Sequence, residues 1–485
     1  MPFEHEERET VAEPSAAPTG ERYEQELSRS LGMMGSIALT LSSVTPASSV
    51  FIIVPFIILT AGTGAFLAMI FAAIVGVFMA FCWAELSAAY PIAGGDYALI
   101  WHAFKGRATP LASPVSFVCF ALVCSSIAFI PAVIALGTAE YLKVVIDLST
   151  PVAGAVVVAV ATGIAILNIR TNAVVTGIFL VIELTALAVL TLLGLINIHP
   201  DRIANLFTAP VIGNATTGAL DPVAFGVILT ATATAVFAYN GYSMPVNLSE
   251  EVKGSSRHIA TAILWSLVIT VAAELIPTTA VLLGAPDLVA VTTSTSPMQT
   301  FMLQTADSTV NTLVSIGVAL AIFNAVIAIL VQFGRILYSA ARDRAFPGKS
   351  NVWLASLNVK WKSPLVATML VGVISFVLCL TVDLGTLITL TGASLVLNYA
   401  LVALAALVGR MVGASDHSPY KMPLWPVAPV LALGALIFIT TQQTQTALLV
   451  TGATVLIGLV YWAIVILPQR GKAWTLLQPS RDEEL

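Results

Sequence analysis

The chain has 485 residues, of which 58% are hydrophobic and only 10% are charged, against roughly 25% charged residues in an average soluble domain. Eleven of the charged side chains lie in residues 1–30 and six follow Pro468, so too few remain to cover a soluble surface. This composition excludes a soluble protein of this length and indicates a surface that faces lipid. The net charge is −5 and no basic face is present, so we expect the lipid bilayer, and no nucleic acid, as a partner.

Residues 1–30 carry eight Glu and three Arg, without the positive start and apolar stretch of a signal peptide. We expect a disordered, acidic cytoplasmic tail. The four cysteines, Cys82, Cys119, Cys124 and Cys379, lie in apolar runs and are expected to be buried small hydrophobic residues, without disulfides or a metal site. Zinc-type His/Glu spacing, a P-loop, a GxSxG motif and a dinucleotide glycine pattern are all missing, so the sequence favours neither an enzyme nor a cofactor.

Twelve apolar stretches have the roughly 20 residues that a helix needs to cross a bilayer. Their predicted limits are 34–60, 64–89, 113–142, 151–169, 174–198, 222–247, 259–284, 311–341, 364–382, 384–409, 425–442 and 446–467. With both ends placed in the cytoplasm, 19 of the 21 basic residues fall on the inner side and only Lys143 and Arg202 fall outside. This asymmetry supports an even number of spans in a cell-membrane protein whose two termini are cytoplasmic. The long outer segments 199–221 and 285–310 are expected to fold over the outer surface.

Two spans contain interruptions near the middle of the membrane. In the first span, five hydroxyl residues surround Pro46 between Leu41 and Val50, and in the sixth span Gly and Pro interrupt the stretch from Tyr239 to Pro245. Irregular backbone is tolerated inside a membrane only where it is buried or lines a cavity. Free N–H groups and the positive end of a half-helix hold an anion, and free carbonyls hold a cation, so two breaks together suit a zwitterionic amino acid.

The two breaks lie five spans apart, which places the second unit upside down relative to the first. The sequence therefore predicts an all-α membrane protein of twelve transmembrane helices, with a five-plus-five inverted repeat, broken helices 1 and 6, and two extra C-terminal helices. The expected parts are the tail 1–30, a first repeat 31–200, a second repeat 222–410, helices 11 and 12 in 423–467, and a cytoplasmic C-terminal tail 468–485. A channel or receptor is the alternative class, but the polar residues cluster at two breaks instead of forming a stripe along a pore.

Three charged segments on the predicted cytoplasmic side resemble signatures of the amino acid–polyamine–organocation (APC) superfamily of permeases. They are Glu85 to Tyr97 (ELSAAYPIAGGDY), Leu248 to Ile263 (LSEEVKGSSRHIATAI) and Arg335 to Pro347 (RILYSAARDRAFP). We expect their charged side chains to pair into an inner gate, with static loop packing as the alternative. The inner-gate residues are Glu85, Glu250, Glu251, Lys253, Arg257, Arg335, Arg342 and Asp343.

The resemblance implies a secondary active transporter that moves an amino acid by alternating access, with helices 1, 2, 6 and 7 moving against helices 3, 4, 8 and 9. The substrate carboxylate would meet N–H groups and hydroxyls between Pro46 and Val50, and the ammonium would meet carbonyls near Leu41 to Ser43 and Phe237 to Asn240. Phe237 is a candidate aromatic lid. The predicted substrate-binding residues are Ser42, Ser43, Thr45, Ala47, Ser48, Ser49, Phe237, Ala238, Tyr239, Asn240, Gly241, Tyr242 and Ser243.

Two departures from the family pattern bear on the substrate and the coupling ion. Ser243 stands where many members carry an acid, so a neutral side chain is favoured, with a small amine, a polyamine or amino acid exchange as alternatives. No Lys or Arg occurs between Thr171 and Asp201, where some members carry a helix 5 lysine. The coupling ion would then be Na⁺, on helix 1 carbonyls and hydroxyls of helices 5 and 8, or H⁺ on Glu183 or Glu274.

Overall fold

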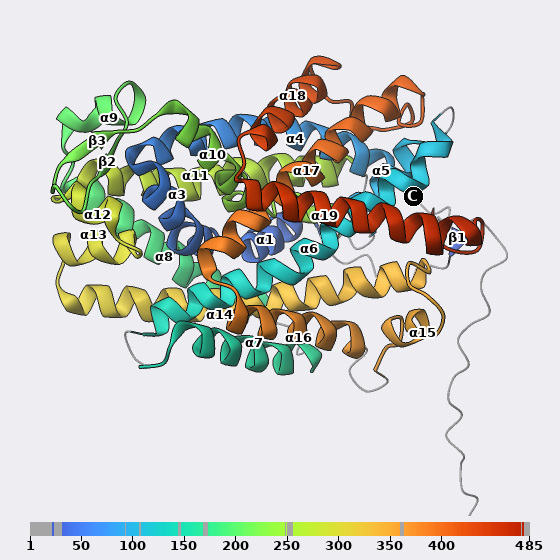
Figure 1. The fold of residues 1–485 in the computed structure, drawn as a ribbon, viewed down its shortest axis with the longest axis horizontal. Helices are drawn as coiled ribbons and strands as arrows, with labels where there is room; N and C mark the ends of the chain where they lie inside the picture. The colour runs from blue at the N-terminus through green and yellow to red at the C-terminus, as the bar shows by residue number, and fades with distance from the viewer. Residues whose placement is uncertain are drawn as a thin grey trace, which may run out of the picture.

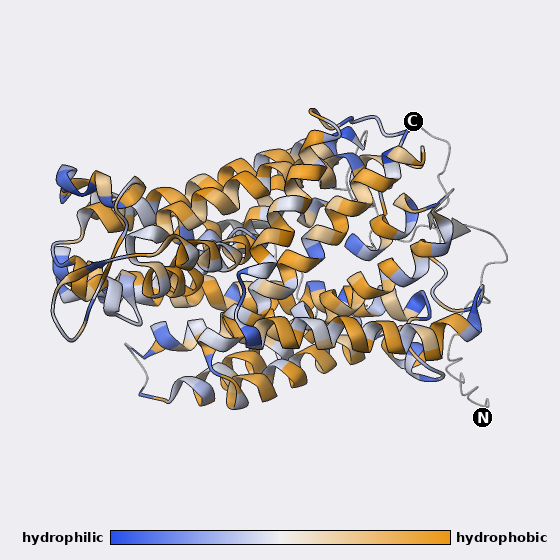
Figure 2. Cartoon of the chain, turned by 45° about the horizontal axis from the view of Figure 1, so that its top comes forward, coloured by the Kyte–Doolittle hydropathy of each residue, from blue (hydrophilic) through white to orange (hydrophobic). Residues whose placement is uncertain are grey.

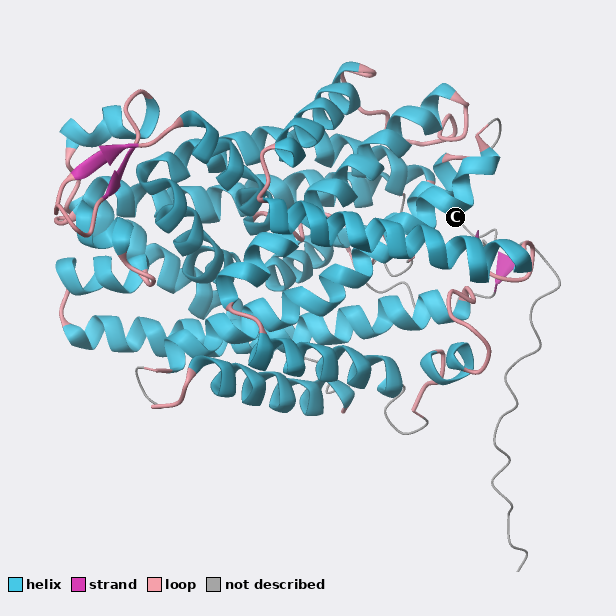
Figure 3. Ribbon diagram, in the orientation of Figure 1, coloured by secondary structure: helices cyan, strands magenta, loops and turns pink. Residues whose placement is uncertain are grey.

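The computed structural model describes residues 22–23, 32–92, 94–105, 108–143, 147–167, 173–247, 249, 256–358, 363–476 and 478–479. Most of the described chain is helical, and the long helices run roughly along one long axis (Figures 1 and 3). The predicted all-α character is therefore confirmed. Within this part of the chain, the few strand residues form two short pairs.

The first half of the chain contains the elements that enclose the helix 1 break. They are β1 (Arg22–Tyr23), α1 (Met33–Val44), α2 (Pro46–Ser48), η1 (Ser49–Ile53), α3 (Val54–Ala61), η2 (Gly62–Gly64), α4 (Ala65–Ala89), α5 (Asp96–Ala103), α6 (Thr109–Leu142), α7 (Thr150–Ile166), α8 (Ala173–Ile196), η3 (Pro200–Arg202) and α9 (Ile203–Phe207).

The second half begins with a short strand pair and continues with long helices. Its elements are β2 (Val211–Gly213), β3 (Leu220–Pro222), α10 (Phe225–Ala238), η4 (Met244–Val246), α11 (Arg257–Gly284), α12 (Leu288–Thr293), α13 (Pro297–Thr305), α14 (Ser308–Arg342), α15 (Ser350–Leu354), α16 (Leu365–Thr381), α17 (Leu384–Met411), α18 (Val427–Thr441), α19 (Gln445–Tyr461), η5 (Trp462–Ile466), η6 (Leu467–Gln469) and β4 (Gln478–Pro479).

In the described part of the chain, each of the twelve predicted apolar ranges is largely helical, and the range 222–247 is interrupted by the turn at 239–243. Among the described residues, seven helical stretches are long and apolar enough to cross a membrane, and the first of them, Met33–Ala89, contains two predicted ranges. The four remaining ranges are the shorter apolar helices α7, α10, α16 and α18. Hydrophilic residues gather toward the two ends of the long axis, while hydrophobic residues dominate between them (Figure 2). Large apolar side chains such as Val181, Leu449 and Ile457 are more than 60% exposed, as expected for contacts with lipid.

Several helices begin with a side chain that caps their first turn. Asp307, Asp383 and Thr444 each accept a hydrogen bond from the backbone N–H three residues later, at the starts of α14, α17 and α19. Such caps satisfy N–H groups that have no partner inside the helix. These caps fix where the three helices begin.

The two predicted outer segments fold into a small layer at one end of the bundle, where α9, α12, α13 and the β2–β3 pair lie together (Figure 1). β2 and β3 pair antiparallel, and Thr63 of η2 ties this layer to the first span. The Thr63 hydroxyl donates to the Asn205 carbonyl at 2.7 Å and accepts from the Val211 N–H at 2.8 Å.

The long helices form two packing groups. In one group α6, α7, α14 and α16 contact one another, and in the other α4 packs against α10 and α11, and α11 packs against α1. The first group contains predicted helices 3, 4, 8 and 9, and the second contains predicted helices 1, 2, 6 and 7. α17 contacts both groups through α6 and α10.

Both predicted breaks are present. α1 ends at Val44, and the next residue, Thr45, has a left-handed φ of 46°. Pro46, which has no N–H to donate, opens the next half-helix. α10 ends at Ala238, and five turn residues follow before η4 begins at Met244. Within that turn Gly241 has a φ of 114°, a conformation that is open to glycine and strained for other residues.

Candidate functional site

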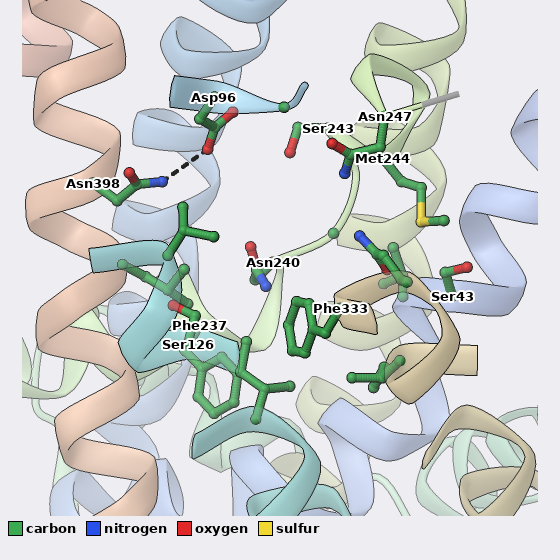
Figure 4. Close-up of a pocket in the computed structure, with 18 of the residues that line it drawn as sticks. Ser43, Asp96, Ser126, Phe237, Asn240, Ser243, Met244, Asn247, Phe333 and Asn398 are labelled. Atoms are coloured by element: carbon green, nitrogen blue, oxygen red, sulfur yellow. Dashed lines mark hydrogen bonds between the residues drawn. The ribbon is translucent and has the colours of Figure 1, made fainter. Parts of the chain in front are cut away.

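The structure contains a cavity of about 130 Å³ at the junction of the two broken helices. Its wall combines the helix 1 break, the turn after α10 and the start of α5 with single faces of α6, α14 and α17. Figure 4 shows polar side chains such as Asn240, Ser126 and Asn398 around this space, together with the rings of Phe237 and Phe333. A wall of hydroxyls, amides and aromatic rings suits a small polar molecule with an apolar part.

Nine of the thirteen predicted substrate-binding residues line this cavity. They are Ser43, Thr45, Ser48, Ser49, Phe237, Ala238, Asn240, Gly241 and Ser243. The other four, Ser42, Ala47, Tyr239 and Tyr242, do not lie on its wall. Tyr239 and Tyr242 instead pack beside Ala72, Val75 and Gly76 of α4, on the other side of the turn.

The two breaks contact each other directly. The Ser49 hydroxyl donates to the carbonyl of Ala238, the last residue of α10, at 2.7 Å. Gly241 approaches Val44 so closely that an added methyl group would lie 2.9 Å from Val44 Cγ2. Tyr399 of α17 donates its hydroxyl proton to Asn240 Oδ1 at 2.9 Å. These contacts fix the turn of helix 6 against the end of α1.

A carboxylate that was not among the predicted binding residues also lines the cavity. Asp96, the first residue of α5, accepts a hydrogen bond from Trp83 Nε1 at 2.7 Å. It accepts a second from Asn398 Nδ2 at 2.8 Å, which Figure 4 shows. Both donors are neutral, and no described Lys or Arg forms an ion pair with this carboxylate. The sequence offered one signal, since Asp96 directly follows the paired glycines Gly94 and Gly95, but its place on the wall depends on how α5 packs against α4 and α17.

The two candidate coupling residues lie behind the helix 1 break. Glu183 of α8 accepts a hydrogen bond from the Ala47 N–H at 2.7 Å, so a side chain of the protein occupies a donor that was expected to bind substrate. Glu274 of α11 is fully buried, and both of its carboxyl oxygens lack a hydrogen-bond partner in the described part of the chain.

The predicted inner gate is only partly within the described structure, because Glu250, Glu251 and Lys253 lie outside the described residues. Glu85, 1% exposed, accepts from Arg410 Nη1 at 3.3 Å and from the Met422 N–H at 2.7 Å, partners that were not predicted. The other four predicted gate residues, three arginines and one aspartate, lie near the ends of α11 and α14.

Those helix-end residues are Arg257 at the start of α11, Arg335 and Arg342 in the last turns of α14, and Asp343, which caps α14. Arg342 and Asp343 form an ion pair at 3.8 Å. Tyr97, a residue of the cavity wall, donates its hydroxyl proton to Asp343 at 3.4 Å. The end of α14 therefore contacts the cavity wall through α5.

Comparison with known proteins places the chain in a family. A model of the amino acid permease family matches residues 31–467, which is most of the chain. An uncharacterized transporter of Mycobacterium tuberculosis is 25% identical over 414 residues, covering 82% of this chain and 83% of that protein. In Bacillus subtilis, a branched-chain amino acid permease is 24% identical over 241 residues, covering 50% of this chain and 51% of that one.

A serine/threonine exchanger of the same bacterium is 23% identical over 240 residues, covering 48% of this chain and 52% of that protein. The family match spans both broken helices, the cavity between them and all twelve apolar ranges. The chain therefore belongs to the amino acid permease family of the APC superfamily and is a multi-pass membrane transporter.

Proposed function

We propose that this permease is a secondary active transporter that moves an amino acid with a neutral side chain across the cell membrane by alternating access. The observation that carries the proposal is the polar cavity at the junction of the two broken helices. Substrate sites of transporters with broken, inverted-repeat helices lie at such junctions. Both termini are taken to be cytoplasmic, because 19 of 21 basic residues then face inward.

The substrate carboxylate is expected at the start of the second half-helix, beside Ser48 and Ser49, where the helix end is positive. The ammonium is expected near the carbonyls that end α1 and α10. The substrate side chain is expected beside Phe237 and Asn240, which also line the cavity. The cavity, of about 130 Å³, is large enough to hold several waters.

Alternating access requires that one side of the site opens while the other is closed. Three residues that follow the helix 6 break line the cavity: Met244, Val246 and Asn247. In the predicted topology they lie on the cytoplasmic side of the cavity. The contacts between α5 and the end of α14, together with the Glu85–Arg410 pair, are candidates for the inner gate. The two packing groups of helices are candidates for the parts that move against each other.

The names of two relatives support a neutral substrate. One is a branched-chain amino acid permease and another is a serine/threonine exchanger, and both names describe uncharged side chains. Exchange of one amino acid for another is therefore the nearest alternative to uptake. The coupling ion is proposed to be H⁺ or Na⁺, with Glu183 and Glu274 as the candidate groups.

A second candidate function is transport of a small amine or a cationic amino acid, and Asp96 favours it. Asp96 lines the cavity, and its carboxylate accepts hydrogen bonds from Trp83 and Asn398. A carboxylate without a fixed cation is costly inside a membrane unless it takes a proton or a positively charged ligand. If the substrate carries a second ammonium group, Asp96→Asn should abolish its transport while sparing neutral amino acids.

The test is uptake by purified protein in proteoliposomes, with a panel of neutral amino acids, cationic amino acids and polyamines. Sodium and proton gradients are imposed separately, and counterflow against internal amino acid measures exchange. The proposal predicts saturable, gradient-driven accumulation of a neutral amino acid. Polyamine uptake alone would favour the second candidate, and flux that does not saturate and never exceeds equilibrium would indicate a channel.

A further inference from the structure

Two acidic side chains lie inside the bundle next to the helix 1 break. Glu183, on α8, is 2% exposed, and Glu274, on α11, is fully buried. α8 and α11 pack against each other, and both also contact α1 and α2. The two carboxyls therefore approach the same short stretch of broken helix from neighbouring helices, and each lies within electrostatic range of the other.

The two carboxyls differ in their hydrogen bonds. Glu183 Oε1 accepts from the Ala47 N–H at 2.7 Å, whereas neither oxygen of Glu274 has a partner among the described residues. Two polar side chains interact with Glu274, those of Ser49 and Tyr239. The Ser49 hydroxyl donates its proton to the last carbonyl of α10, and the Tyr239 hydroxyl has no hydrogen-bond partner among the described residues. A buried carboxyl with two unused oxygens is costly in its ionised form and points to a functional role for Glu274.

The surrounding helices supply no cation near the pair. The described residues of α1, α2 and α8 contain no Lys, Arg or His. Arg257 and His258 lie in the first turn of α11, at least about 24 Å along the helix from Glu274. On the neighbouring helices, Arg335 and Arg342 lie in the last turns of α14, and α4 contributes only Cys82 and Glu85.

Two ionised carboxylates in these surroundings would lose their hydration and repel each other. The pair must therefore hold at least one positive charge. The Ala47 N–H and the positive start of the half-helix favour the ionised form on Glu183, which leaves Glu274 as the group that takes the proton.

We propose that Glu183 and Glu274 form one proton-binding site, which controls how firmly α8 holds the half-helix that begins at Pro46. When one proton is bound, it forms an O–H bond on Glu274, and the Glu183 carboxylate keeps a charge-assisted hydrogen bond to Ala47. A second proton neutralises Glu183, and its bond to Ala47 becomes an ordinary, weaker one.

Protonation of the pair affects the cavity through the two residues that follow Ala47. Ser48 and Ser49, which directly follow Ala47, lie on the cavity wall. A change in the anchoring of Ala47 therefore changes the part of the site that is expected to hold the substrate carboxylate. Because binding energies are linked, a proton that favours substrate binding is itself bound more tightly when substrate is present. This inference rests on the proposed function, because it assigns the proton of an amino acid transporter.

The test compares wild-type protein with Glu183→Gln and Glu274→Gln, in which an amide replaces each acid at the same size. Glu140→Gln is the matched control, because Glu140 lies at the C-terminal end of α6 and pairs with Lys143 at 2.9 Å. Wild type and control should bind substrate with an affinity that changes up to about tenfold per pH unit over the titration of the pair. Each Gln variant keeps one of the two acids, so its substrate affinity should depend on pH less steeply than that of wild type, and it should lose proton-driven accumulation.

Proton-driven accumulation in both Gln variants would overturn the pair while leaving amino acid transport intact. Accumulation driven by sodium alone, with sodium dependence lost in Glu274→Gln, would overturn it in favour of a sodium site. A second measurement needs neither folded variants nor transport. Dicyclohexylcarbodiimide reacts with protonated carboxyls in apolar surroundings, so mass spectrometry of labelled wild-type protein should find Glu274 modified, and less so at high pH. No modification of Glu274 at any pH would overturn the assignment even if the proposed substrate is wrong.

Discussion

Replacing Gly241 by alanine tests whether the two breaks must contact each other. Gly241 has a φ of 114°, and strain of this kind costs about 1–3 kcal/mol for a residue with a Cβ. The added methyl would also lie 2.9 Å from Val44 Cγ2 and 3.4 Å from Val44 Cα, and crowding in a packed interior costs about 1–3 kcal/mol. Val44 is β-branched and has little freedom to move away.

A total penalty of about 3 kcal/mol corresponds to roughly a hundredfold loss in population of the present arrangement. We therefore expect substrate uptake by Gly241→Ala in proteoliposomes to fall by about that factor, while the protein remains helical by circular dichroism. Gly226→Ala is the control, because Gly226 lies on the same helix, α10, with no atom within 4 Å of the added methyl. Uptake by Gly241→Ala within threefold of wild type would refute the claim that the closeness of the breaks matters.

Three further changes test other parts of the account. Glu85→Ala removes the acceptor of Arg410 and the Met422 N–H. Because Arg410 is 24% exposed, we expect the free energy of unfolding to fall by about 2–3 kcal/mol, below the usual range for buried pairs. Thermal unfolding in detergent of Glu85→Ala, Arg410→Ala and the double variant checks this, and additive losses in the double variant would contradict it. Thr386 donates its hydroxyl proton and its N–H to Asp383, and these hydrogen bonds lower the pKa of Asp383. The charge of Asp383 therefore stabilises the fold fully above the unfolded pKa of about 3.9, and this contribution is lost as the pH falls through the folded pKa. Asp383→Ala should lower the free energy of unfolding by about 1 kcal/mol near neutral pH, because it removes the helix cap. Asp383→Asn keeps the cap and should lose only the contribution of the charge, a difference from wild type that disappears in acid. Equal melting temperatures for wild type and Asp383→Ala would contradict the role of the cap. Ser243→Asp places a carboxylate on the cavity wall, so competition assays should show a shift toward cationic substrates, and an unchanged profile would count against this position.

The helices were predictable because the bilayer imposes a length and a composition. Each predicted apolar range is largely helical where the structure describes it, and the breaks fall where Pro46 and the Tyr239–Pro245 stretch interrupt the pattern. Proline and glycine act locally, through a missing N–H and a permitted φ, so the sequence alone reveals them. Likewise, nine of the thirteen predicted binding residues line the cavity, because they belong to the breaks themselves.

What the sequence did not reveal depends on contacts between distant helices. Asp96 lies on the cavity wall because Trp83 and Asn398, 13 residues before it and 302 residues after it, hold its carboxylate. Tyr239 packs beside α4 and not on the cavity wall, a placement that spacing alone does not specify. These residues become visible only when the helices are assembled.

The bond between Glu183 and Ala47 is a further example, since 136 residues separate them. From the sequence, Glu183 was one of two separate candidates for carrying a proton, and Ala47 was a candidate substrate contact. In the structure the two residues bind each other, and Glu274 lies nearby with unused oxygens. A membrane acid is easily found from sequence because it is rare there, but its partner is not.

The central claim is that the cavity between the two breaks holds the transported amino acid, and equilibrium binding to Ser48→Phe tests it most directly. Ser48 lines the cavity and is 2% exposed, so the added ring must occupy the space expected for the substrate carboxylate. With thermal stability measured in parallel, we predict that radiolabelled substrate binds to wild type and that binding to the folded variant is lost. Wild-type affinity in folded Ser48→Phe would contradict the account.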